Sequence, residues 1–109
     1  MIVATFGWSF TSPLKLGAMK AHLDSISGRP WSEGESHWHG DYLAQELAEG
    51  TVARIYSVAG GFVVKLGYRS LEDDVEVTKQ RIASARSILL SKVLPAIRAI
   101  NIAETEPRD

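Results

Sequence analysis

Residues 51–69 have the sequence TVARIYSVAGGFVVKLGYR, and this stretch decides the fold. Two runs, 51–58 and 62–69, are rich in β-branched and aromatic residues, which favour strands. Glycines separate the runs, and a two-residue turn of type I′ at Gly60-Gly61 connects antiparallel strands directly. The stretch therefore predicts a β-hairpin.

The register of this hairpin follows from the side chains that it buries. The turn at Gly60-Gly61 gathers the apolar side chains on one face, whereas a three-residue turn would set Arg54 opposite Leu66 on that face. Because a one-residue slip exchanges the two faces of a strand, burial favours the two-residue turn. The predicted cross-strand pairs are Ala59–Phe62, Ser57–Val64, Ile55–Leu66, Ala53–Tyr68, Tyr56–Lys65 and Arg54–Gly67.

Two elements are predicted before the hairpin. Residues 2–10 alternate between larger apolar and smaller side chains, and this period of two predicts a half-buried strand. Ser12 and Pro13 then supply an N-cap and a proline at the first helical position, and Gly28 supplies a C-terminal cap. Because apolar side chains recur at helical spacing between these caps, residues 13–27 are predicted to form an amphipathic helix.

A long helix is predicted after the hairpin, over residues 72–102. Acidic residues crowd its first turns, where the helix dipole favours them, and an apolar stripe at helical spacing continues to its end. Pro95 is expected to kink or divide the helix. Residues 88–97 are apolar nearly all the way round, which predicts unusual burial or a partner. The tail, residues 104–109, is expected to fray.

The segment between the first helix and the hairpin is less regular. Residues 28–40 have neither period and are rich in turn formers, so they predict a loop with a short extended piece at 36–39. Asp41 is expected to cap a short helix that ends at Gly50. The prediction is thus one α+β domain, residues 1–109, with a single layer of antiparallel or mixed sheet against the helices, in the order β-α-(short α)-β-β-α.

Composition narrows the class of protein. The 109 residues are 45% hydrophobic and 23% charged, as in an ordinary globular domain. The sequence contains no cysteine, which excludes disulfides and thiolate zinc sites and fits a reducing, cytoplasmic compartment. The N-terminus lacks a signal-peptide pattern, and polar residues interrupt the longest apolar stretch, so no membrane association is expected.

The charge pattern bears on partners. The formal net charge of −1 gives no electrostatic case for binding nucleic acid. Residues 24–49 contain six acids and one base, whereas residues 78–103 contain five bases and no acid. The bases late in a helix complement its dipole, so the acidic segment is the more informative of the two.

One stretch, residues 31–42, holds the candidate functional side chains. If it is extended near its middle, His37 and His39 project to the same side, and nearby carboxylates could complete a metal site of nitrogen and oxygen ligands. Exposed or hydrogen-bonded histidines are the simpler interpretation. The candidate binding residues are Trp31, Glu33, Glu35, His37, Trp38, His39, Asp41 and Tyr42.

The aromatic residues of this stretch allow a second interpretation. Trp31, Trp38 and Tyr42, surrounded by carboxylates, form a composition suited to protein recognition or to stacking on a sugar or base. Tryptophans in a loop also fold back into the core. We therefore expect one tryptophan to be buried and the other to lie near the surface.

The sequence contains no complete catalytic set, and no cofactor is predicted. The leading hypothesis is a small binding protein of the inhibitor, toxin-immunity or accessory-subunit kind, whose aromatic anchors and carboxylates face a basic partner protein. The alternative is a metal-dependent or acid/base enzyme that uses His37, His39 and nearby carboxylates. A third hypothesis is a structural homo-oligomer assembled through the helix at residues 88–100.

Overall fold

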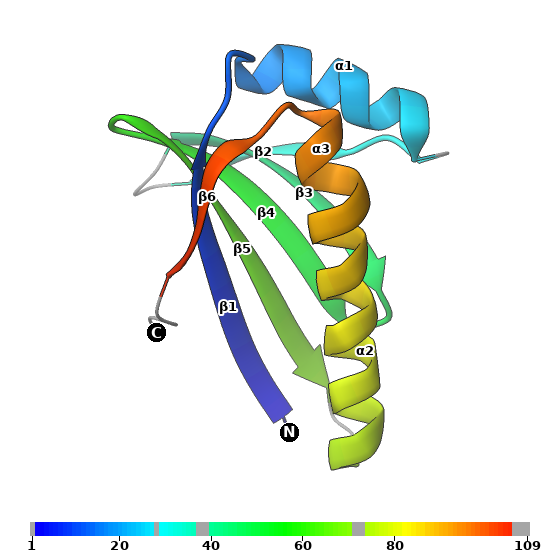
Figure 1. The fold of residues 1–109 in the computed structure, drawn as a ribbon. Helices are drawn as coiled ribbons and strands as arrows, with labels where there is room; N and C mark the ends of the chain where they lie inside the picture. Colours follow the sequence, from blue (N-terminus) through cyan, green and yellow to red (C-terminus); the bar gives the residue numbers. More distant parts are fainter. Residues whose placement is uncertain (1, 28, 37–39, 71–73, 106–109) are drawn as a thin grey trace.

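The computed structural model describes residues 2–27, 29–36, 40–70 and 74–105, which form an α+β fold (Figure 1). The described strands make a six-stranded antiparallel sheet in the order β2-β3-β4-β5-β1-β6. The strands are β1 (Ile2–Thr11), β2 (Ser32–Ser36), β3 (Gly40–Ala48), β4 (Thr51–Val58), β5 (Gly61–Ser70) and β6 (Ile100–Thr105). The helical elements are α1 (Leu16–Ile26), α2 (Val75–Ile88), a π-helical turn η1 (Leu89–Val93) and α3 (Leu94–Ala96).

Both helical segments lie on the same side of the sheet, as Figure 1 shows. The expected α+β class and the single sheet layer packed on helices are therefore confirmed, although the order of elements differs from the prediction. No helix in the described part of the chain is long and apolar enough to cross a membrane.

The predicted hairpin forms as β4 and β5, but its turn lies one residue earlier than expected. Val58 pairs with Gly61, so Ala59 and Gly60 occupy the turn. Gly60 has φ +81°, a conformation that glycine adopts without strain, whereas Ala59 is not among the residues with positive φ. The predicted type I′ turn needs positive φ at both central residues and is therefore wrong.

The observed register is shifted by two residues from the predicted one. Because side chains alternate with a period of two, this shift preserves the face that each residue occupies. Ile55 and Leu66 are therefore buried on one face as expected, although they are not partners. The observed pairs are Thr51–Tyr68, Ala53–Leu66, Arg54–Lys65, Ile55–Val64, Tyr56–Val63 and Ser57–Phe62, so none of the predicted pairs is correct.

A close approach between strands explains why a glycine is needed at position 61, which lies in β5 and not in the turn. A Cβ atom at Gly61 would lie 2.7 Å from the carbonyl oxygen of Phe10 in the neighbouring strand β1. The second glycine of the pair therefore serves packing between strands, while the first serves the turn. Sequence reasoning assigned both glycines to the turn.

The prediction for residues 28–50 is largely wrong. The expected loop contains β2, and the expected short helix from Asp41 to Gly50 is instead strand β3 and the turn that follows it. Leu43 of β3 is buried and pairs with Ile55 of β4, which extends the sheet. The apolar residues of this segment fit a helical or a strand period, and pairing with the otherwise open edge of β4 favours the strand.

The C-terminal helix is shorter than predicted. It changes to a π-helical turn at Leu89 and ends at Ala96, one residue after Pro95. Arg98 then has φ +57°, and the chain turns back as β6 along β1, with Ala103 opposite Ser9. The helical prediction to residue 102 is therefore wrong, because pairing with the edge of β1 outweighs the continuing apolar pattern.

The end of β6 corrects one further expectation. Glu104 and Thr105 pair with Trp8 and Gly7 of β1, so they belong to the sheet and not to a frayed tail. The rest of the predicted tail, residues 106–109, lies outside the described residues.

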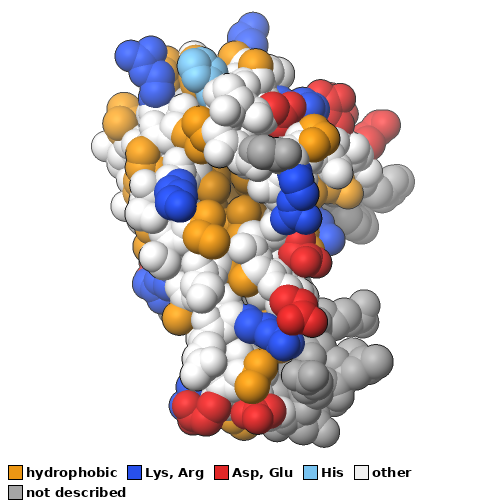
Figure 2. All heavy atoms as spheres, turned by 90° about the vertical axis from the view of Figure 1, so that its right-hand side faces the viewer, with side chains coloured by type: hydrophobic (Ala, Val, Ile, Leu, Met, Phe, Trp, Pro, Cys, Tyr) orange, Lys and Arg blue, Asp and Glu red, His pale blue; other side chains and the backbone are white. Residues whose placement is uncertain are grey.

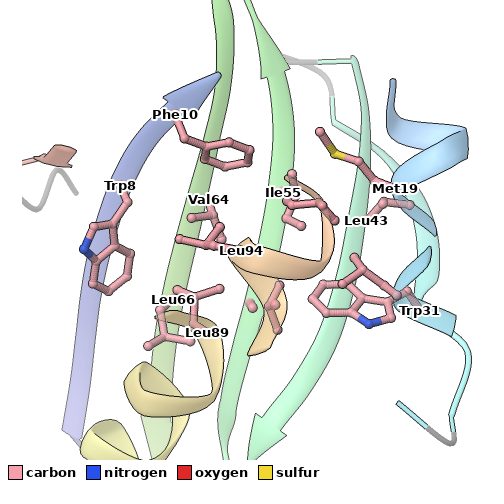
Figure 3. Packing of buried hydrophobic residues seen from close by; sticks show 14 of the residues in the cluster. Trp8, Phe10, Met19, Trp31, Leu43, Ile55, Val64, Leu66, Leu89 and Leu94 are labelled. Carbon is pink, nitrogen blue, oxygen red and sulfur yellow. The ribbon is translucent and has the colours of Figure 1, made fainter. Parts of the chain in front are cut away.

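The core lies between the sheet and the helices. Side chains from the central strands, such as Ile55 and Val64, point toward Leu89 and Leu94 of the helical segment (Figure 3). Residues 88–97 were predicted to be unusually buried or to contact a partner, because they are apolar nearly all the way round. Four of their side chains are buried in the core: Leu89, Val93, Leu94 and Ile97. Figure 2 shows the side of the molecule that lies on the right in Figure 1. On this side, basic and acidic side chains are interspersed with hydrophobic ones.

The contact between Gly61 and β1 yields a test of the fold. Gly61→Ala places a methyl group against the backbone of Phe10 and should lower the free energy of unfolding by about 1–3 kcal/mol. Gly67→Ala is the matched control, because a Cβ atom there meets nothing within 4 Å. Its effect should stay within about 1 kcal/mol. Urea denaturation measures both values, and equal effects of the two substitutions would contradict this packing.

Candidate functional site

The predicted site lies on the hairpin β2–β3, and its side chains are divided between the two faces of the sheet. In the register of this hairpin, Glu35 pairs with Asp41 and Glu33 pairs with Leu43. Because Leu43 is buried beneath the helices, the three carboxylates lie on the helix-bearing side. Tyr42 alternates with them and lies on the opposite, helix-free side. Tyr42 nevertheless also borders a hollow beside these carboxylates.

The carboxylates form a cluster of like charge. Glu35 and Asp41 are directly opposite each other, Glu33 is the next residue on the same face of β2, and all three are exposed. Like charges at directly paired positions destabilise a sheet. None of the ion pairs among the described residues involves this cluster. We refer to Glu33, Glu35 and Asp41 as the acidic cluster.

A hollow of about 490 Å³ lies against this cluster. It extends from the first turn of α1 to the edge of the sheet, where β2 is the outermost strand. Its apolar part comes from leucines of α1 and β3, and its charged rim is acidic. The residues that line it are Leu16, Gly17, Glu33, Gly34, Glu35, Asp41, Tyr42 and Leu43.

Trp31 belongs to the core. Its side chain is 2% exposed and lies in the buried cluster with Met19 and Leu43 (Figure 3). It is therefore the buried tryptophan of the expected pair, and its core position removes it from the candidate surface anchors. Trp38, the other candidate, lies outside the described residues.

The predicted metal ligands His37 and His39 also lie outside the described residues. Within the part of the chain that the structure describes, no group of three His, Asp or Glu side chains could hold a metal ion. Metal binding and the enzyme hypothesis that depends on it remain predictions.

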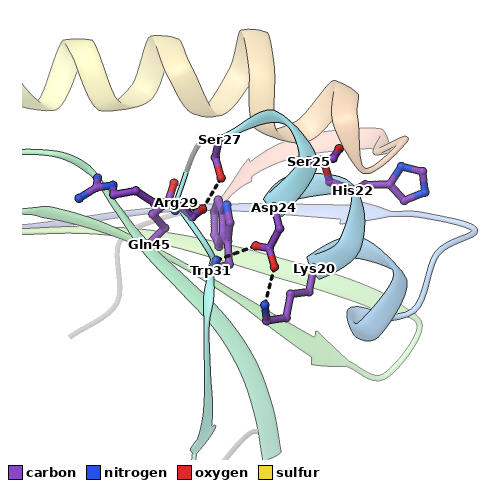
Figure 4. Close-up of polar contacts among 8 residues, drawn as sticks. All are labelled: Lys20, His22, Asp24, Ser25, Ser27, Arg29, Trp31 and Gln45. Atoms are coloured by element: carbon purple, nitrogen blue, oxygen red, sulfur yellow. Dashed lines mark hydrogen bonds and ion pairs between the residues drawn. The ribbon is translucent and has the colours of Figure 1, made fainter.

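A polar clamp positions the start of β2 (Figure 4). The Asp24 carboxylate of α1 accepts hydrogen bonds from the Trp31 amide at 2.7 Å and from the Lys20 ammonium at 2.5 Å. Nearby, Gln45 of β3 donates to the carbonyl of Arg29 at 3.1 Å. These bonds tie the segment that leads into β2 to both α1 and β3.

The clamp shifts the titration of Asp24. The hydrogen bond from Lys20, followed by that from the Trp31 amide, lowers the pKa of Asp24 below its ordinary value. Sequence reasoning missed this group. The only local signal was the spacing of Lys20 and Asp24, four residues apart on a helix, which favours an ion pair.

Comparison with protein-family models and with curated protein sequences finds no match for this chain.

The clamp predicts how stability depends on pH. Since the folded state lowers the pKa of Asp24, its carboxylate stabilises the fold above the ordinary aspartate pKa, and this contribution is lost as the pH falls through the lowered value. Asp24→Asn cannot titrate, so its unfolding midpoint in urea should fall less on acidification than that of the wild type. Glu46→Gln, at an exposed site on β3, serves as the control and should follow the wild type. Identical curves for all three proteins would rule out this role of Asp24.

Proposed function

We propose that this protein is a small binding protein that recognises a basic segment of a partner protein through the acidic cluster and its hollow. The observation that carries the proposal is the direct pairing of Glu35 with Asp41, beside Glu33 and an open, partly apolar hollow. A basic side chain placed between these carboxylates would relieve their repulsion. Inhibitors, toxin-immunity proteins and accessory subunits are the kinds of protein that act in this way.

The place of the cluster at the edge of the sheet supports an extended partner. The outer side of β2 has no neighbouring strand among the described residues, so its backbone groups are available for strand addition. Acidic residues on an edge strand discourage indiscriminate pairing with other strands. Together these features favour an extended segment that carries lysine or arginine at alternate positions.

Neutralising the cluster tests the proposal. The probe is a synthetic peptide of alternating lysine and valine, measured by isothermal titration calorimetry. The double variant Glu33→Gln, Glu35→Gln should bind it roughly three- to tenfold more weakly, because each exposed ion pair contributes up to about 1 kcal/mol. Binding by the wild type should also weaken as salt is added.

The matched control removes the same charge elsewhere. Glu46 and Glu76 are exposed and lie outside the hollow, so the variant Glu46→Gln, Glu76→Gln should bind like the wild type. Equal losses in the two double variants would show that only net charge matters and would reject the hollow as the binding site.

Self-association is a second candidate function, and exposed apolar residues on the edge strand β6 and on the helical segment favour it. Leu90 of the helical segment is 37% exposed, and Ile100 and Ile102 of β6 are 59% and 45% exposed. Such residues on an edge strand are a route to pairing between copies. In sedimentation velocity, association through this region should raise the sedimentation coefficient with concentration, and Ile102→Glu should abolish the rise. A wild-type protein that stays monomeric would remove this candidate.

A further inference from the structure

The helix-free face of the sheet carries a second charged surface, of opposite sign to the acidic cluster. Arg54 of β4 pairs directly with Lys65 of β5, and both alternate with buried residues, so they lie on the side away from the helices. None of the ion pairs found in the described ranges includes either cation. Two like charges at directly paired positions cost stability, which an anion between them would recover.

Aromatic side chains border these cations. The rings of Tyr42 and Tyr56, cross-strand partners on β3 and β4, lie 5.3 Å apart at 41°. The Lys65 ammonium lies 5.7 Å from the centre of the Tyr56 ring. Burial raises the pKa of the Tyr56 hydroxyl. Tyrosine and arginine are enriched at protein interfaces because they combine a large contact area with a polar end.

Two glycines, Gly67 and Gly34, lie near these side chains. A Cβ atom at Gly67, two residues along β5 from Lys65, would meet nothing within 4 Å. At the edge of the sheet, the Tyr42 ring covers Gly34, where a Cβ atom would lie 2.4 Å from the ring. The surface is thus a broad sheet face with two cations near its centre and a tyrosine pair on one side.

We propose that this basic aromatic face, defined by Tyr42, Arg54, Tyr56 and Lys65, is a docking surface for an acidic amphipathic helix of a partner protein. The central strands β4 and β5 are hydrogen-bonded to neighbours on both sides, so they cannot accept an added strand. Contact must come from side chains, and a helix on the second face of a sheet is a common layer arrangement. Glutamates of the helix would pair with Arg54 and Lys65, while its apolar residues would cover the tyrosines.

Charge favours an acidic helix over two other possible occupants of this face, a second copy of the chain and a single-stranded nucleic acid. A second copy docked face to face by two-fold symmetry would bring Arg54 and Lys65 against the same cations of its partner. Single-stranded nucleic acid needs a groove of several cations along its backbone, and the pair on this face, in a chain of net charge −1, is too small a footprint.

Binding of designed peptides to the whole protein tests the proposal. The probe is a synthetic helical peptide with glutamate and leucine at helical spacing, measured by fluorescence anisotropy. The variant Arg54→Gln, Lys65→Gln should bind it at least about tenfold more weakly, because two charge-assisted hydrogen bonds are lost. The control Lys79→Gln, Lys92→Gln removes two exposed cations from the helical segment and should bind like the wild type.

Two further measurements make the result decisive. Urea denaturation should show that Arg54→Gln, Lys65→Gln is at least as stable as the wild type, because the like-charge pair is gone. A lysine-leucine peptide should bind the wild type and the variant Arg54→Gln, Lys65→Gln alike, and an oligothymidylate should bind poorly. The proposal is overturned if both double variants bind the acidic peptide equally, if no acidic peptide binds saturably, or if the oligothymidylate binds more tightly than the peptide and depends on Arg54 and Lys65.

Discussion

The alternation of side chains along β4 and β5 is the constraint on which the rest of the molecule depends. One set of side chains, including Ile55 and Val64, is buried beneath the helices, and the other set, including Arg54 and Lys65, lies on the free face. The buried set fixes where η1 and α3 pack, since Leu89 and Leu94 point toward the same strands (Figure 3). Every strand added on either side inherits this division into faces. The separation of the carboxylates of β2–β3 from Tyr42 follows from it.

The sequence was sufficient for the parts of the fold that depend on local pattern. The strand at residues 2–10, a first helix and the β4–β5 hairpin follow from periodicity and turn residues, and the structure contains all three. The predicted start of the first helix is wrong, because α1 begins at Leu16 after Lys15, and Ser12 and Pro13 lie before the helix. The exact register did not follow, because both glycines at 60 and 61 fit a turn equally well. The second glycine pairs with Val58 in β5 and lies close to Phe10, a contact between residues far apart in the chain.

The elements at the two edges of the sheet could not be predicted for the same reason. Residues 40–48 and 100–105 have apolar spacings that a helix or a strand can satisfy, and their strand form depends on hydrogen bonds to β4 and β1. The failure to predict strands β2 and β3 also affected the prediction of the candidate site. The structure pairs Glu35 with Asp41, but a loop has no faces, so the orientation of Tyr42 to the opposite face and the burial of Trp31 became visible only with the strands.

Two directly paired sets of like charge now stand on opposite faces of one sheet: Glu35 with Asp41 on the helix side, and Arg54 with Lys65 on the free side. Each set costs a few tenths of a kcal/mol to about 1 kcal/mol. Placing opposite charges at either pair would remove that cost without changing any buried contact. A small domain has little stability to spare, so partners that neutralise these pairs would offset a cost that the fold alone does not. In the two proposals, one partner surface is basic and the other acidic, and their location on opposite faces would allow both to bind at once.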